Sequence, residues 1–160
     1  MAMDETPITL AGKNKLDAEL IHLVKVEREE IKVAISEARA LGDLKENAEY
    51  HSAKEKQAII EGRIAQLQGI LARARVVEVS SIKSNRIVFG ATVSVLDVEK
   101  NASITYRIVG EDESDSRANK ISFNSPLGKA LIGKEEGDTV IVKAPKGDIE
   151  LEIESFEFVD

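Results

Sequence analysis

The sequence contains no cysteine, only two histidines and only 4% aromatic residues. Without cysteine the chain has no disulfide, no thiol nucleophile and no thiolate zinc site, and two histidines cannot build a histidine-rich metal centre. A bound metal would therefore be held mainly by oxygen ligands. Four Phe, two Tyr and no Trp also argue against a large aromatic-lined ligand pocket. No stretch approaches the roughly 18 apolar residues of a membrane span, and the acidic start of the chain does not resemble a secretion signal, so we expect a cytoplasmic protein.

Charge narrows the possible partners. The 160 residues include 22 Lys and Arg against 29 Asp and Glu, a formal net charge of −7. This balance argues against a general binder of duplex DNA, because neutralising phosphates requires a concentrated basic surface. It leaves room for a local basic patch. The length and the 42% hydrophobic content fit one domain or two small ones.

The first half of the chain has a helical pattern. Between Gly12 and Arg75 there is no proline, and apolar residues recur at helical spacing in two runs: Leu16, Leu20, Leu23, Ile31, Ile35, Ala38 and Leu41, then Ile60, Ile64, Leu67, Leu71 and Ala74. Gly42 can close one helix, and Asp43 can cap the next. The pattern predicts a tight antiparallel helical hairpin in residues 1–77, with arms of about 30 residues and on the order of 45 Å.

The second half alternates apolar and polar residues and is rich in β-branched side chains, which predicts strands. We expect them at residues 76–79, 86–89, 91–96, 103–109, 120–123, 139–142 and 150–153, with turns at 90, 100–101, 110 and 146–148. A short helix is expected at 126–132, because Ser125 can cap it and Pro126 suits its first position. The predicted fold class is α+β, with the helical hairpin followed by a small α+β domain in residues 78–160.

The densest polar cluster, residues 41–51, falls where the two helices meet. Asp43 and Glu46 are three residues apart, so on a helix they would share a face and could hold one divalent cation. The same spacing is that of a capping pair, in which Asp43 accepts a hydrogen bond from the amide of residue 46 and Glu46 reaches back. Spacing alone does not decide between these two interpretations.

Basic residues surround this cluster. Arg39 and Lys54 lie on opposite helices and, together with Lys45, could form a local basic patch, although a helical Lys or Arg is usually a solvated surface charge. His51 is equally ambiguous, since a lone histidine near a hairpin tip is more often a solvated residue than a ligand.

The block 42–51 is accompanied by further segments, and the combination is that of a known protein family. These segments are residues 9–10, 15–16, 37–39, 61–64, 88–93, 106–110, 125–128 and 131–134. In this combination the chain resembles the Gre family of bacterial transcript cleavage factors over nearly its whole length. The resemblance is most specific at residues 42–51.

The resemblance implies an FKBP-like C-terminal domain that docks on RNA polymerase, and an N-terminal coiled-coil hairpin whose tip enters the polymerase secondary channel. The chain would be a transcription elongation factor and not itself an enzyme, because it stimulates the polymerase's own cleavage of backtracked nascent RNA. Asp43 and Glu46 match the tip carboxylates that share Mg²⁺ with the polymerase active site, and no cofactor is expected to bind the free protein tightly. The resemblance also implies DNA binding as a class property, which the acidic charge does not favour.

Arg39 and Lys54 match the basic patch that contacts the RNA 3′ end in the family. Lys54 stands where we expect an arginine, and lysine cannot hold a phosphate bidentately, so this contact is expected to be weaker.

Three alternative functions stay open. An inhibitor could occupy the secondary channel without promoting cleavage, although the presence of both Asp43 and Glu46 argues against it. A prolyl isomerase or chaperone would need an apolar aromatic pocket, for which the chain has few residues. A plain coiled-coil adaptor would not require the polar tip cluster.

Overall fold

The computed structural model describes residues 4–42 and 47–160. The chain divides into two compact units, Lys13–Arg73 and a second unit that combines Met1–Gly12 with Ala74–Asp160. Within the described ranges, no helix is both long enough and apolar enough to cross a membrane.

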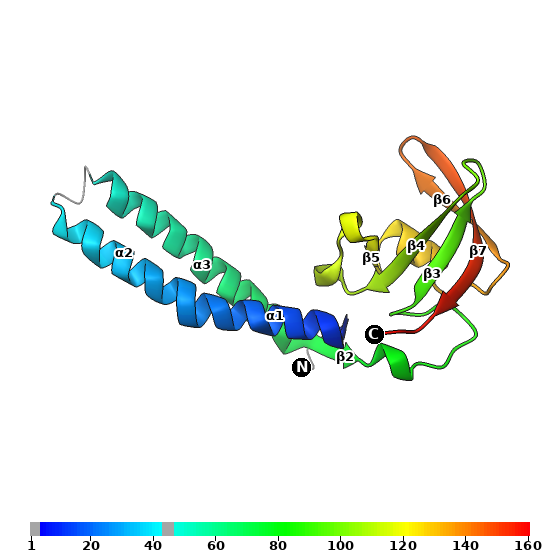
Figure 1. Ribbon diagram of the computed structural model, residues 1–160, viewed down its shortest axis with the longest axis horizontal. Helices are drawn as coiled ribbons and strands as arrows, with labels where there is room; N and C mark the ends of the chain where they lie inside the picture. The colour runs from blue at the N-terminus through cyan, green and yellow to red at the C-terminus, as the bar shows by residue number, and fades with distance from the viewer. Residues whose placement is uncertain (1–3, 43–46) are drawn as a thin grey trace. The chain divides into compact units, whose positions relative to one another are not determined.

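The helical unit is an antiparallel hairpin (Figure 1). Its first arm consists of α1 (Leu10–His22), a π-helical turn (Leu23–Glu27) and α2 (Arg28–Ala40), and α3 (Ala48–Arg73) returns along it. The predicted apolar runs supply the buried seam: Leu16, Leu23, Ile31, Ile35 and Ala38 from the first arm, Ile64 and Leu67 from the second, joined by Ala53. The π turn adds a residue to the helix where the apolar run has its longest gap, between Leu23 and Ile31, and so brings both parts of the run onto one face.

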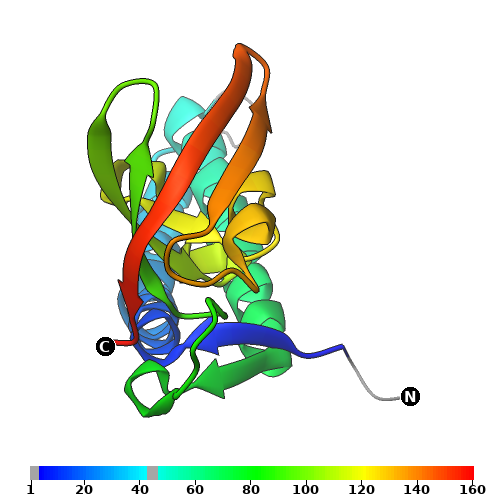
Figure 2. The same cartoon turned by 90° about the vertical axis from the view of Figure 1, so that its right-hand side faces the viewer.

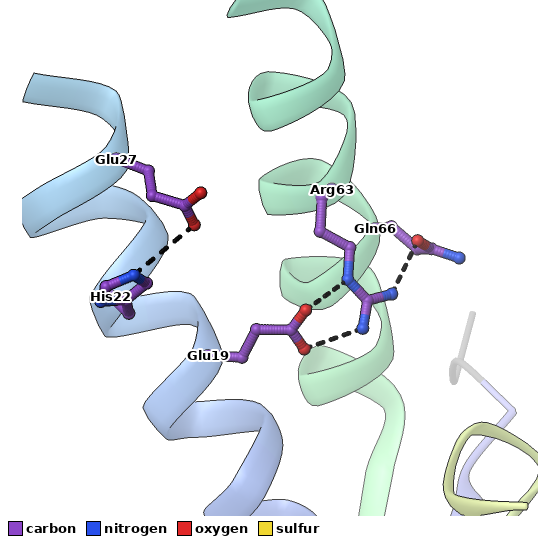
Figure 3. A network of polar contacts seen from close by, with 5 residues as sticks. All are labelled: Glu19, His22, Glu27, Arg63 and Gln66. Carbon is purple, nitrogen blue, oxygen red and sulfur yellow. Dashed lines mark hydrogen bonds and ion pairs between the residues drawn. The ribbon is translucent and has the colours of Figure 1, made fainter. Parts of the chain in front are cut away.

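Ion pairs join the two arms. One edge of the Arg63 guanidinium, Nε and Nη2, donates to both carboxylate oxygens of Glu19 at 2.8 Å, as Figure 3 shows, and Arg28 donates to Glu61 at 2.8 Å. The hydrogen bond from Arg63 is the main reason that the pKa of Glu19 lies below its usual value, and the hydrogen bond to Glu61 raises the pKa of Arg28. A bidentate contact fixes geometry as well as charge, so it sets the register of the arms.

The second unit contains a five-stranded sheet with the order β5-β4-β3-β7-β6. Only β4 and β5 run parallel; the other neighbours are antiparallel, and Figure 2 shows the long strand β7 beside β6. The strands are β3 (Thr92–Asp97), β4 (Ala102–Val109), β5 (Lys120–Ser122), β6 (Thr139–Ala144) and β7 (Gly147–Glu157). Their inward side chains, including Val93, Val95, Ile108 and Ile153, pack with Leu131 of α4 (Pro126–Leu131) to form the core.

A second, two-stranded sheet pairs β1 (Thr6–Thr9) in parallel with β2 (Ala74–Val77). The carboxylate of Glu113 holds the end of β1 in place: it accepts the Thr9 N–H at 3.1 Å, the Gly110 N–H at 2.8 Å and the Thr9 hydroxyl. The Thr9 oxygen in turn accepts the Gly12 N–H at 3.0 Å and so caps the first turn of α1. A Cβ at Gly12 would lie 2.0 Å from the Glu113 carboxylate, so a larger residue would push this carboxylate away from its hydrogen-bond donors.

The predicted α+β class with its helical hairpin is confirmed, and so is the helix capped by Ser125, whose Oγ accepts the Gly128 N–H at 3.1 Å. The strand predicted at 86–89 is wrong. Ile87 is fully buried there, but its N–H donates to Lys134 O at 2.8 Å and its carbonyl accepts from Gly133 N–H at 2.7 Å, so this segment pairs with a loop. Strand β1 was not predicted, and β7 begins at Gly147, inside the predicted turn.

Candidate functional site

The candidate site is the end of the hairpin, where α2 stops and α3 starts. The last turn of α2 closes through Leu41 N–H, which donates to Ala38 O at 3.2 Å. Gly42 follows with φ +133°, a conformation that favours glycine. The chain therefore leaves the first arm at the glycine that the sequence singled out.

Asn47 joins the two helix ends. Its Oδ1 accepts the Tyr50 N–H at 3.0 Å, which makes it the N-cap of α3, and its Nδ2 donates to Ala38 O in the last turn of α2 at 2.5 Å. Its own carbonyl accepts the His51 N–H at 3.1 Å, the first helical hydrogen bond of α3. One half-buried amide side chain therefore supplies a donor to one helix and an acceptor to the other.

Asp43, Lys45 and Glu46 lie outside the described residues, so their roles as a capping pair, metal ligands or basic patch stay predictions. Across residues 4–42 and 47–160, no three His, Cys, Asp or Glu side chains come together in a way that could hold a metal ion. Carboxylate oxygens are the ligands that Mg²⁺ prefers, and it keeps several positions for water or a second molecule. The carboxylates of Asp43 and Glu46 are thus of the ligand type that Mg²⁺ prefers.

Arg39, in the last turn of α2, is exposed and lies over an aromatic ring. Its guanidinium carbon is 5.7 Å from the centroid of Tyr50, within the range of a cation–π contact. The ring of His51 meets the Tyr50 ring edge-on, with centroids 5.6 Å apart and planes inclined by 66°. The hairpin end therefore combines a cation with two aromatic rings.

Lys54 lies one helical turn after Tyr50 in α3 and is exposed. Its Nζ donates to Gln57 Oε1 at 3.1 Å, a neutral partner that leaves its positive charge uncompensated. The structure thus places Arg39 and Lys54 on opposite helices, as predicted, while their contact with RNA stays a prediction.

A groove of about 410 Å³ lies between α2 and α3 beside this end. Alanines from both helices line its floor (Ala34, Ala38, Ala48 and Ala53), while Glu37, Glu49 and Lys56 add charge of both signs. Because its charge is mixed, the groove does not extend the positive surface of Arg39 and Lys54.

The sequence analysis missed Asn47 and Tyr50. Asparagine is among the best N-cap residues, and its place before the helical run was a usable signal. The contact of Tyr50 with Arg39 has no such signal, because these residues meet only when the two helices pack.

Comparisons with known proteins agree with this architecture. Residues 6–76 match the family model described as "Transcription elongation factor, N-terminal", and residues 82–158 match "Transcription elongation factor, GreA/GreB, C-term". A protein of Thioalkalivibrio sulfidiphilus (strain HL-EbGR7) named transcription elongation factor GreA is 51% identical, over 98% of this chain and 100% of its own length.

A protein of the same name from Anaeromyxobacter sp. (strain K) is 53% identical, over 99% of this chain and 95% of its own length. Among solved structures, GreA factor homolog 1 (Gfh1) of Thermus thermophilus is 28% identical and covers 96% of this chain and 99% of its own, with a TM-score of 0.44. None of these names or descriptions supports DNA binding. The two family matches together span most of the sequence, and the chain belongs to the GreA/GreB family of transcription elongation factors.

Proposed function

We propose that this protein binds bacterial RNA polymerase and stimulates the polymerase's own Mg²⁺-dependent cleavage of backtracked nascent RNA, which releases arrested elongation complexes. The observation that carries the proposal is full-length similarity to proteins named transcription elongation factor GreA, in a chain whose two helical arms meet at a segment containing Asp43 and Glu46. In this proposal the hairpin domain, residues 1–77, enters the secondary channel, and residues 78–160 dock on the polymerase.

The hairpin has the dimensions and stiffness that such a role needs. Helix α3 has 26 residues, which corresponds to about 39 Å at 1.5 Å per residue. The apolar seam and the ion pairs of Glu19 with Arg63 and Arg28 with Glu61 hold this arm against its partner. A braced arm can carry a small group of side chains to a remote site without losing their mutual geometry.

The chemistry assigned to the tip requires only oxygen ligands. When bound, a second Mg²⁺ in phosphodiester hydrolysis activates the attacking water and neutralises charge that develops on the phosphate. Asp43 and Glu46 would hold this ion together with ligands of the polymerase, and their remaining carboxylate oxygens would accept hydrogen bonds from the water. The chain contributes ligands and the polymerase remains the enzyme.

In this proposal Arg39 and Lys54 bind the extruded RNA. Both are exposed cations near the helix ends, and their positive charge attracts the phosphates of the RNA 3′ segment. This local charge is compatible with the net charge of −7, because it is confined to the hairpin end.

The direct test is an elongation complex stalled in the backtracked state, with the RNA labelled near its 3′ end. Adding the protein with Mg²⁺ is expected to release short 3′ fragments faster than polymerase does alone. Asp43→Asn and Glu46→Gln, which remove charge at nearly constant size, are expected to abolish this stimulation and to leave the affinity for polymerase unchanged.

Glu55→Gln is the matched control, since Glu55 is an exposed carboxylate on α3 and its loss removes the same charge. It is expected to stimulate cleavage like the unmodified protein. Polymerase binding without any stimulation by the unmodified protein would refute the proposal and favour a channel-occupying inhibitor. Normal cleavage by either tip variant would refute the assignment of the ligands.

A further inference from the structure

The basic side chains of the hairpin differ in the groups that they contact. Lys13, Arg28, Lys32 and Arg63 each form an ion pair with a carboxylate of the hairpin. Arg39 forms no ion pair with any carboxylate in the described part of the chain. Its guanidinium lies over the ring of Tyr50 instead, 5.7 Å from the centroid. An aromatic ring orients a guanidinium without neutralising it, so the contact with Tyr50 leaves the positive charge of Arg39 in place.

The Tyr50 ring, which contacts Arg39, is itself fixed by its neighbours. Tyr50 is half-buried and packs on the apolar cluster of Ile31, Ile35 and Ala53, and its backbone N–H is fixed by Asn47. The ring of His51 contacts it edge-on. Tyr50 is thus a rigid support in the first turn of α3, and Arg39 reaches it from the last turn of α2.

We propose that Tyr50 is a positioning residue that presents the guanidinium plane of Arg39 for stacking with an unpaired base of the extruded RNA; this deepens the proposed function and rests on it. Guanidinium planes and aromatic rings are the groups on which proteins stack splayed-out RNA bases. The Arg39 guanidinium lies 5.7 Å from the centroid of the Tyr50 ring, and in this proposal the side of the guanidinium that is turned away from the ring takes the base. Because the side chain is already oriented, binding costs less conformational entropy than it would for a freely rotating arginine.

The test separates stacking from charge and from folding. Tyr50→Leu removes the ring and keeps an apolar side chain on the cluster, whereas the conservative variant Tyr50→Phe keeps the ring. Each variant is added to a backtracked complex whose RNA ends either in a normal nucleotide or in an abasic one. Affinity for polymerase and thermal melting of the free protein are measured in parallel.

With the normal RNA, Tyr50→Leu is expected to lower the cleavage rate at saturating protein by about two- to fivefold, the scale of an exposed cation–π contact. Tyr50→Phe is expected to match the unmodified protein. With the abasic RNA, the unmodified protein and Tyr50→Leu are expected to cleave at equal rates, because no base is left to stack. Arg39→Lys, which keeps the charge but not the plane, is expected to behave like Tyr50→Leu with both RNAs.

Two results would overturn the inference. One is a Tyr50→Leu protein as active as Tyr50→Phe on the normal RNA. The other is an equal loss on normal and abasic RNA, which would mean that Tyr50 only supports the fold of the hairpin end. Failure of the proposed function is a separate result, since the unmodified protein would then stimulate no cleavage on either RNA.

Discussion

Replacing Asn47 tests how the hairpin end is held together. The side chain donates from Nδ2 to Ala38 O at 2.5 Å and accepts the Tyr50 N–H at Oδ1 at 3.0 Å. Asn47→Ala removes both contacts. Asn47→Ser keeps an oxygen that can cap α3 but is too short to reach the carbonyl of Ala38.

The two contacts have separable energies. Loss of an asparagine N-cap costs about 1 kcal/mol. The hydrogen bond to Ala38 O adds about 1 kcal/mol, and not the larger penalty of an unpaired buried carbonyl, because Leu41 N–H also donates to that oxygen. We therefore expect Asn47→Ala to destabilise the hairpin end by about 2 kcal/mol and Asn47→Ser by about 1 kcal/mol.

Native-state hydrogen exchange measures the local stability of the hairpin end, amide by amide. A change of about 2 kcal/mol raises the population of the open hairpin end by about 30-fold, so the amides of Tyr50 and His51 should exchange faster by that factor in Asn47→Ala. The amide of Leu67, a fully buried residue far along α3, should exchange at an unchanged rate.

The matched control is Asn14→Ala, because Asn14 is an exposed asparagine within α1 and not at a helix end. It should leave the exchange of Tyr50 and His51 as it is. Unchanged exchange of these amides in Asn47→Ala would refute the role of Asn47. Equal effects of the alanine and serine variants would refute the contribution of its bond to Ala38. If the proposed function holds, Asn47→Ala should also lower RNA cleavage more than polymerase binding.

Two further predictions concern other parts of the chain. Glu113→Ala removes the acceptor of three hydrogen bonds from Thr9 and Gly110, so the free energy of unfolding measured by urea titration should fall by about 3 kcal/mol. Glu113→Gln keeps one acceptor oxygen and should lose about half as much. Equal losses in the two variants would contradict this account. The pKa of Glu19 is lowered by its hydrogen bond from Arg63, so this pair stabilises the fold above the unfolded pKa of Glu19 and the stabilisation is lost as the pH falls through the lower folded value. The pair is partly exposed, so Arg63→Gln should cost less than about 1 kcal/mol at neutral pH. The melting temperatures of the variant and the unmodified protein should converge as the pH falls through the lowered pKa of Glu19, and a difference that persists in acid would contradict this account.

The helical hairpin and most strands of the small domain were predictable because their patterns are local. Helix and strand periods decide which side chains share a face, and the buried seam of Leu16, Leu23, Ile64 and Leu67 follows the predicted runs. The short helix α4 was predictable for a similar reason, since Ser125 and Pro126 act within a single turn.

The strand predictions were wrong where the sequence pattern indicates that a residue is buried but not which segment its backbone hydrogen-bonds to. Ile87 lies in a β-branched, apolar segment and is fully buried, yet its backbone bonds to Gly133 and Lys134 in a loop and not to a strand. The missed strand β1 shows the opposite error. Its four residues include Pro7 and have too little pattern to suggest a strand, yet they pair in parallel with β2, more than 60 residues later in the chain.

By itself, then, the sequence determined the α+β class, the two amphipathic arms and the glycine at which the first arm ends. Only the tertiary structure decided which groups meet there and at the start of the chain: Asn47 between two helix ends, Arg39 over Tyr50, and Thr9 on Glu113. Local periodicity specifies which face of an element is apolar, whereas these contacts join residues from different elements, and their partners are set by how the elements pack.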